Sequence, residues 1–329
     1  MNQRESNPPS VALMTPLLNS EEDRPIRIGL ITVGGTNSNT VAAMAHGLIG
    51  VACTIAIDRD SAALQKSGAD RIILIGAGDI GSIRPKKTHE MARKQANDID
   101  AAINDLDLVL IVASMYGATG QGISPVVVEV ARRRGIATLA IVVVPTEWQG
   151  ESSRFGIDAA VRVLQRRGAT VFPIPSKRIG DALVHEENEV VKGVENLFAT
   201  VSRSVNQSQH MWIDLEDLPS VLHPGGIAAM GVGSAAGTDR AAKAAQRAID
   251  HPLLGAERLR HASGVLVNTR GKAGSMRLTE VKTVMRLIKS SLPINAPVLH
   301  ITSNEDWVRD ELVVSIVITV SPAHQGSST

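Results

Sequence analysis

The stretch that most constrains the fold is an apolar run, residues 108–115, that leads directly into the glycine-rich segment 116–122 (YGATGQG). An apolar run of this length, followed by glycines and then by the apolar segment 125–132, predicts a buried strand, a tight loop and a helix. Glycines allow the backbone to turn with positive φ and to approach a ligand closely. The loop amides and the positive end of the helix dipole together favour an anion, and we expect a polyphosphate.

The loop alone does not identify its ligand. It is not a Walker sequence, because no Gly-Lys-Ser/Thr follows the glycines, and its glycine spacing differs from that of the dinucleotide fingerprint. A tight strand-to-helix turn without any ligand remains an alternative interpretation. YGATGQG nevertheless resembles the GGGTGTG signature of the tubulin and FtsZ superfamily. The matching residues are Gly117, Thr119, Gly120 and Gly122, and the departing ones are Tyr116, Ala118 and Gln121.

Composition excludes several classes of function. The 329 residues carry a net charge of +1, so no electrostatic case exists for nucleic acid or an anionic membrane as a bulk partner. Aromatic residues make up 2%, too few for base-stacking platforms. No apolar run reaches membrane-spanning length, and residues 1–24 lack the apolar segment of a signal peptide. The single cysteine, Cys53, fits a reducing cytoplasm, and the scattered histidines predict no transition-metal site.

A repeated strand–helix pattern surrounds the glycine-rich segment. Strands are predicted at residues 26–33, 53–57, 71–75, 108–115, 137–144 and 171–173, with helices at 40–48, 61–67, 88–104 and 157–167 between them. This alternation predicts an α/β fold with a doubly wound parallel sheet. The resemblance adds a tubulin/FtsZ-like division of the chain. It implies a flexible arm (1–24), a nucleotide-binding domain (25–184), a long core helix (185–210), a smaller α+β activation domain (211–321) and a short tail (322–329).

Two further loops resemble parts of the family's nucleotide site. The segment after the first strand resembles GVGGxGGNAV, which implies binding roles for Gly34, Gly35, Thr36 and Asn39. The loop after the second strand resembles the family's N-T-D loop, with Asp60 matching and Asp58 in place of an amide. Acids at the carboxyl end of a strand face the ligand crevice of such a sheet. A role for Asp60 as the N-cap of the following helix is an equal alternative.

Recognition of sugar and base is only partly preserved. Residues 145–150 resemble KPFxxEG, with Pro145 matching and Gln149 in place of the Glu that contacts ribose. Ser153 stands where a phosphate-side Arg is usual, and the neighbouring Arg154 is a substitute. Asn188 aligns with the Asn with which the family recognises guanine. A side-chain amide suits this role because it can both donate and accept a hydrogen bond at the edge of the base. The alternative for Asn188 is a polar residue at an exposed helix end.

The candidate catalytic residues are Asp214 and Asp217. Residues 212–221 resemble the family's N-x-D-x-x-D loop, with Trp212 replacing the Asn. In the family those acids act in the next subunit's nucleotide pocket, which implies hydrolysis only on head-to-tail contact. A carboxylate can hold the attacking water and accept its proton. Asp217 before Pro219 also fits a helix N-cap, which is the alternative interpretation.

The C-terminal part resembles the family most closely. Residues 228–254 resemble AMMGxGxAxGxxRAxxAAxxAIxxPLL, in which we interpret the glycine turn as structural. Strands at 264–268, 297–302 and 311–320, with a helix at 279–290, predict a compact α+β domain whose last strand is central. The sequence ends without the long linker and anchor-binding peptide of the division proteins, so we expect a divergent relative.

The resulting prediction is an FtsZ-like cytoplasmic GTPase that forms head-to-tail homopolymers, with GTP or GDP and Mg²⁺ as ligands. It needs no nucleic acid and no direct membrane insertion. The alternative is a nucleotide-binding homologue with weak or no hydrolysis that modulates another FtsZ-type filament, motivated by Trp212, Gln149 and Ser153. A nicotinamide dehydrogenase fits only the strand–helix repeats.

Overall fold

The computed structural model describes residues 26–34, 51–76, 84–145, 151–176, 218–304 and 310–321. The predicted N-terminal arm, the core helix at 185–210 and the tail at 322–329 lie outside these ranges. Among the described residues, no helix combines the length and apolarity needed to cross a bilayer.

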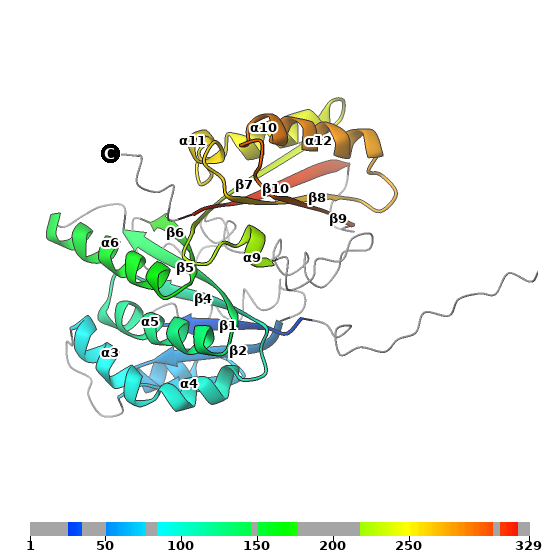
Figure 1. The fold of residues 1–329 in the computed structure, drawn as a ribbon. Helices are drawn as coiled ribbons and strands as arrows, with labels where there is room; N and C mark the ends of the chain where they lie inside the picture. The colour runs from blue at the N-terminus through cyan, green and yellow to red at the C-terminus, as the bar shows by residue number, and fades with distance from the viewer. Residues whose placement is uncertain are drawn as a thin grey trace, which may run out of the picture.

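Six parallel strands form the N-terminal half of the sheet (Figure 1). Their order is β3-β2-β1-β4-β5-β6, so the chain winds one way from β1 and the other way from β4. This arrangement confirms the predicted doubly wound sheet. The strands are β1 (Ile28–Val33), β2 (Val51–Asp58), β3 (Arg71–Leu74), β4 (Leu108–Ser114), β5 (Ala137–Pro145) and β6 (Thr170–Ser176).

Amphipathic helices pack on one face of these strands, where aliphatic side chains of β1, β2, β4 and β5 form a buried core with them. These helices are α3 (Pro85–Lys94), α4 (Ala96–Ile103), α5 (Ala118–Arg133) and α6 (Glu151–Arg166). The short helix α2 (Ser61–Gln65) joins β2 to β3 and contacts both strands. The single helix predicted at 88–104 is wrong, because the chain breaks at Gln95 between α3 and α4. Gln95 Nε2 donates to Leu74 O at 2.8 Å, and Gln95 Oε1 accepts from Gly76 N at 3.0 Å. Contacts with β3 therefore set this break.

The C-terminal half adds a mixed set of strands and helices. They are α9 (Leu218–Val221), β7 (Ile227–Ala236), α10 (Arg240–Ile249), α11 (Ala256–Leu259), β8 (Gly264–Gly271), α12 (Leu278–Ser290), β9 (Val298–Asn304) and β10 (Glu311–Val320). β10 runs antiparallel between β7 and β8, and its residues are buried except Glu311. The prediction of a central last strand is confirmed.

The two halves share one ten-stranded sheet, because β6 pairs with β7 through Val171 and Ile227. In the C-terminal half, α10, α11 and α12 cover one face over a second aliphatic core. The alanine-rich helix α10 lies very close to β7. A Cβ on Gly231 would lie 2.0 Å from Ala248 O, and one on Gly233 would lie 2.3 Å from Ala244 O. Glycine in the strand and alanine in the helix thus permit this close packing.

Candidate functional site

The segment 116–122 differs from the predicted loop, because α5 begins at Ala118 and takes most of the signature residues into its first turns. The expectation of positive φ at its glycines is also wrong. Gly117 is the N-cap in an extended conformation (φ −122°, ψ 165°), and neither Gly120 nor Gly122 has positive φ. Gly120 and Gly122 have another physical reason to be glycines, because a side chain at either position would collide with neighbouring elements.

Gly120 and Gly122 let α5 approach its neighbours closely. A Cβ on Gly120 would lie 1.9 Å from Ser114 O at the end of β4. A Cβ on Gly122 would lie 2.6 Å from Thr88 Cβ and 2.8 Å from Pro85 O, both on α3. Any side chain would push the helix off the strand or off α3. The two glycines therefore fix where the first turn of α5 sits.

Gly117 has the opposite surroundings. It is exposed, and a Cβ placed on it would meet no atom within 4 Å. The first amides of an α-helix have no intrahelical partner, and Gly117 has no side chain with which to cap them. The start of α5 thus presents backbone donors, including those of Ala118 and Thr119, beside open space. This combination favours a bound anion.

Gln121 is fastened to the strand end by its side chain. Its Nε2 donates to Met115 O at 2.7 Å, which spans the turn between β4 and α5. The side-chain amide nitrogen of this predicted binding residue is therefore engaged within the protein, and its backbone N donates to Gly117 O at 3.3 Å. Tyr116 packs against the aliphatic core on the other face of the sheet.

The end of β1 contacts this turn directly. Gly34 has φ +64°, and a Cβ on it would lie 2.8 Å from Thr119 Cγ2. Gly34 N donates to Ile57 O at 3.0 Å, which ties the same position to β2. β1 and β4 are the neighbouring strands between which the winding reverses, and ligands of doubly wound sheets bind at the carboxyl ends of such strands. Two predicted binding segments, far apart in sequence, thus meet at the expected place.

Asp60 is the N-cap of α2. Its Oδ1 accepts from Ala62 N at 2.8 Å and from Ala63 N at 3.2 Å. The structure therefore supports the capping alternative for this predicted binding residue. Asp58, which stands in place of an amide in the same N-T-D-like loop, lies half-buried at the carboxyl end of β2. Burial raises the pKa of the Asp58 carboxyl above its usual value, and a perturbed acid at a strand end is a candidate functional group.

Of the remaining predicted binding and catalytic residues, the structure describes Pro145 and Arg154. Pro145 is the last residue of β5, whose Val143 O accepts from Met115 N at 2.9 Å, so this strand end lies beside the signature turn. Arg154 lies on α6. The residues outside the described ranges are Gly35, Thr36, Asn39, Gln149, Asn188, Asp214 and Asp217.

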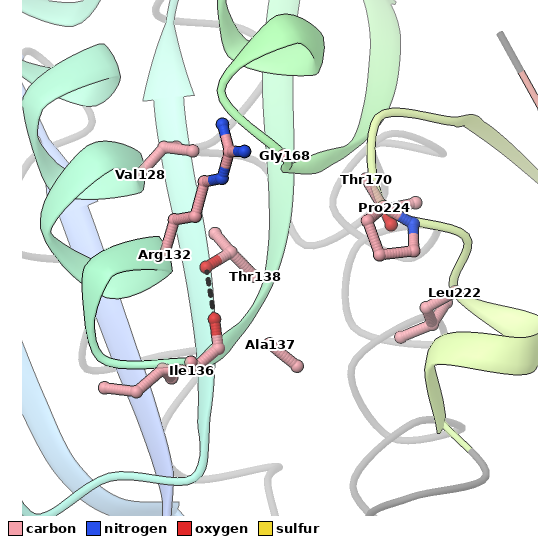
Figure 2. A pocket seen from close by; sticks show the side chains of 10 residues that line it. Val128, Arg132, Ile136, Ala137, Thr138, Gly168, Thr170, Leu222 and Pro224 are labelled. Atoms are coloured by element: carbon pink, nitrogen blue, oxygen red, sulfur yellow. Dashed lines mark hydrogen bonds between the residues drawn. The ribbon is translucent and has the colours of Figure 1, made fainter.

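A cavity of about 210 Å³ lies at the opposite edge of the sheet (Figure 2). It is lined by the end of α5, the start of β5, the turn between α6 and β6, and Leu222 and Pro224. These are amino ends of strands, so this cavity is separate from the signature turn. Within the described ranges, no group of three His, Cys, Asp or Glu side chains is arranged to hold a metal ion.

Comparison with known proteins agrees with this geometry. A family profile described as Tubulin/FtsZ family, GTPase domain, matches residues 27–183, and one described as FtsZ family, C-terminal domain, matches residues 226–321. Cell division protein FtsZ of Buchnera aphidicola subsp. Schizaphis graminum is 32% identical over 306 residues, covering 89% of this chain and 78% of that protein. Cell division protein FtsZ 1 of Halobacterium salinarum is 31% identical over 309 residues, covering 89% and 76%.

A solved structure titled "FtsZ dimer, empty", from M. jannaschii, superposes with a TM-score of 0.77 at 25% identity, covering 91% of this chain and 90% of that one. The sheet order defines the class of doubly wound α/β proteins, whose ligands bind at the carboxyl ends of the strands. Within that class, the chain belongs to the tubulin/FtsZ family.

Proposed function

We propose that this protein is an FtsZ-like polymerising GTPase of the cytoplasm that binds guanine nucleotide at the carboxyl ends of β1 and β4. The observation that carries the proposal is the contact between Gly34 and Thr119, which joins two predicted phosphate-facing segments at the reversal point of the sheet. The match to a GTPase-domain profile over residues 27–183 names the nucleotide class.

The described residues fit a nucleoside polyphosphate. The first amides of α5 donate to phosphate oxygens, and open space beside Gly117 lets the phosphates approach the backbone. Gly120 and Gly122 hold those amides in place through their close packing. Mg²⁺, when bound, neutralises phosphate charge, and a nucleotide-bound Mg²⁺ needs few or no protein carboxylates.

Hydrolysis is proposed to need two protomers. Asp214 and Asp217 would hold the attacking water in line and accept its proton, while the amides of α5 on the adjoining protomer hold the phosphates. Neither protomer alone would then bring acids and nucleotide together. Relatives named as cell division proteins, and a relative solved as an FtsZ dimer, support self-association.

Sedimentation of purified protein with GTP, with GDP and without nucleotide tests this proposal. We expect pelleting with GTP, together with phosphate release that rises more than linearly with protein concentration. Asp214→Ala is expected to abolish most release while leaving nucleotide binding intact. Specific activity that stays flat across concentrations would contradict catalysis shared between protomers.

A second candidate is a nucleotide-binding homologue that hydrolyses weakly and modulates another FtsZ-type filament. The hydrogen bond from Gln121 Nε2 to Met115 O and the capping role of Asp60 Oδ1 favour it, because each of these atoms already has a partner within the protein. It predicts GTP binding without pelleting or phosphate release, so the same experiment separates the two candidates.

A further inference from the structure

A histidine on α3, His89, contacts the backbone of the first turns of α5 through its side chain. His89 Nδ1 lies 3.1 Å from Gly122 O, and its side chain is half-buried between the two helices, which lie side by side (Figure 1). Gly122 belongs to the first turns of α5, next to the amides that face the proposed phosphate site.

The position of Gly122 explains why a side chain reaches its carbonyl. Without a Cβ at Gly122, Pro85 and Thr88 of α3 come close enough for the following residue, His89, to contact the α5 backbone. Pro125 lies inside α5, and a proline removes one helical hydrogen bond and displaces the carbonyl four residues earlier. The carbonyl that loses its helical donor is that of Gln121, the residue before Gly122, so the stretch of α5 that His89 contacts has one internal hydrogen bond fewer.

Arg167 selects the tautomer of His89. Its Nη2 lies 3.5 Å from His89 Nε2, and a guanidinium can only donate. Nε2 must then accept, so Nδ1 carries the proton and donates to Gly122 O. Arg167 is itself anchored on α5, because its Nη1 donates to Pro125 O at 3.2 Å and pairs with Glu129. Arg167, the residue directly after α6, thus determines which ring nitrogen of His89 donates and which accepts.

We propose that His89 is a positioning residue for the phosphate-binding turn, acting through the hydrogen bond from its Nδ1 to Gly122 O. This rests on the proposed nucleotide site. His89 does not touch the nucleotide. It fixes the amides of the first turn, and preorganised donors bind an anion more tightly than donors that must be ordered on binding.

Two variants of matched shape test the proposal. In His89→Asn the amide nitrogen takes the place of Nδ1 and keeps a donor, whereas His89→Leu has similar volume and no donor. GDP affinity is measured by calorimetry on the full chain, and the thermal midpoint is measured without nucleotide. We expect His89→Asn to bind GDP within about twofold of wild type and His89→Leu about tenfold more weakly, the effect of one hydrogen bond. The thermal midpoints of both variants should stay well above the temperature of the calorimetry, so that each variant is titrated as a folded protein.

The control is His261→Gln, because 41% of the His261 side chain is exposed and it pairs with the exposed Glu257 in the C-terminal half, away from α5. It should bind GDP like wild type. Equal affinity in wild type and both His89 variants would overturn the positioning role alone, as would equal weakening in both. A loss of affinity in His89→Leu that is accompanied by partial unfolding at the temperature of the titration would also overturn it. Failure of wild type to bind GDP would overturn the proposed function together with this inference.

Discussion

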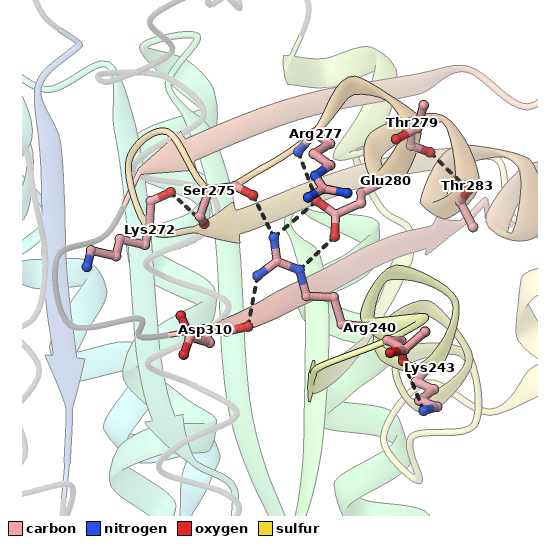
Figure 3. A network of polar contacts seen from close by, with 10 residues as sticks. Arg240, Lys243, Lys272, Ser275, Arg277, Thr279, Glu280, Thr283 and Asp310 are labelled. Atoms are coloured by element: carbon pink, nitrogen blue, oxygen red, sulfur yellow. Dashed lines mark hydrogen bonds and ion pairs between the residues drawn. The ribbon is translucent and has the colours of Figure 1, made fainter.

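Arg240 Nε donates to Glu280 Oε1 at 2.6 Å, and this ion pair joins the first turn of α10 to the first turn of α12 (Figure 3). The guanidinium also donates to Glu280 Oε2, to Ser275 O at 2.7 Å and to Asp310 O at 2.8 Å. One side chain thereby connects two helices, the turn after β8 and the entry to β10. The pair is well shielded, with 12% of the Arg240 side chain and 19% of the Glu280 side chain exposed.

Replacing Arg240 should destabilise the C-terminal half strongly. Arg240→Gln removes the ion-pair partner of the shielded Glu280 carboxylate, which keeps its hydrogen bond from Arg277 N, and it takes a donor from two backbone carbonyls. Breaking such a pair costs about 3 kcal/mol. Urea unfolding measures the change. Arg260→Gln is the control, because its pair with Glu257 is more than 70% exposed and its loss should cost less than about 0.5 kcal/mol. Equal effects of the two substitutions would contradict the role of Arg240.

The same pair predicts a pH dependence. The hydrogen bond from Arg240 lowers the pKa of the Glu280 carboxyl below its usual 4.5. A lowered folded-state pKa contributes stability that is present above the unfolded-state value and is lost as the pH falls through the folded-state value. Glu280→Gln should therefore be less stable than wild type at pH 7, and the difference should shrink as the pH falls below about 4.5. Thermal midpoints of both proteins from pH 7 to pH 3 measure it, and a difference constant with pH would exclude this linkage.

The Asp58 carboxyl should affect the pH dependence of stability in the opposite direction to Glu280. Burial raises the pKa of its carboxyl, so the folded state binds more protons than the unfolded state and stability falls as the pH rises through this range. Asp58→Asn should raise the thermal midpoint at pH 7, with a gain that diminishes toward pH 3. Both hydrogen bonds at this side chain, from Arg59 N and Asp60 N, go to Oδ1, which an amide retains.

The control for Asp58 is Asp60→Asn. Asp60 is exposed and caps α2, and Asn is as good an N-cap as Asp, so the thermal midpoint should hardly change. A wild-type protein more stable than Asp58→Asn at pH 7 would show that the charged carboxylate is stabilised by a contact beyond its backbone donors.

The sheet could be predicted from the sequence because its strands are continuous apolar runs, which is typical of strands buried on both faces. β10 spans the residues predicted for it, and the predicted strands lie within a few residues of β1 to β9. The break at Gln95 could not be predicted, because its partners Leu74 and Gly76 lie about 20 residues earlier in the chain.

The candidate site was predicted in its residues more than in its geometry. Glycines in sequence indicate a flexible loop, whereas Gly120 is required by its closeness to Ser114 O, a tertiary contact that no local pattern reports. Asp60 fitted both a ligand role and a cap, because an acid between a strand and a helix satisfies both patterns. Only the positions of Ala62 N and Ala63 N distinguish them.

Gly117→Ala offers the sharpest separation of binding from folding. Gly117 has φ −122°, which alanine adopts without strain, and a methyl group there would meet no protein atom within 4 Å. The only expected cost to folding is that of a poorer N-cap, about 0.5–1 kcal/mol. The methyl group would nevertheless occupy the space through which phosphates reach the first amides of α5, so GDP affinity should fall by about tenfold or more.

Gly156→Ala is the matched control, because Gly156 lies exposed on α6 and its added methyl group also meets no atom within 4 Å. Alanine in a helix interior should stabilise that variant by about 0.5–1 kcal/mol and leave GDP affinity unchanged. Calorimetric titration with GDP and urea unfolding of both variants separate the two effects. If Gly117→Ala binds GDP as tightly as Gly156→Ala does, the phosphates do not lie against the start of α5, because an added methyl group there would have to exclude them.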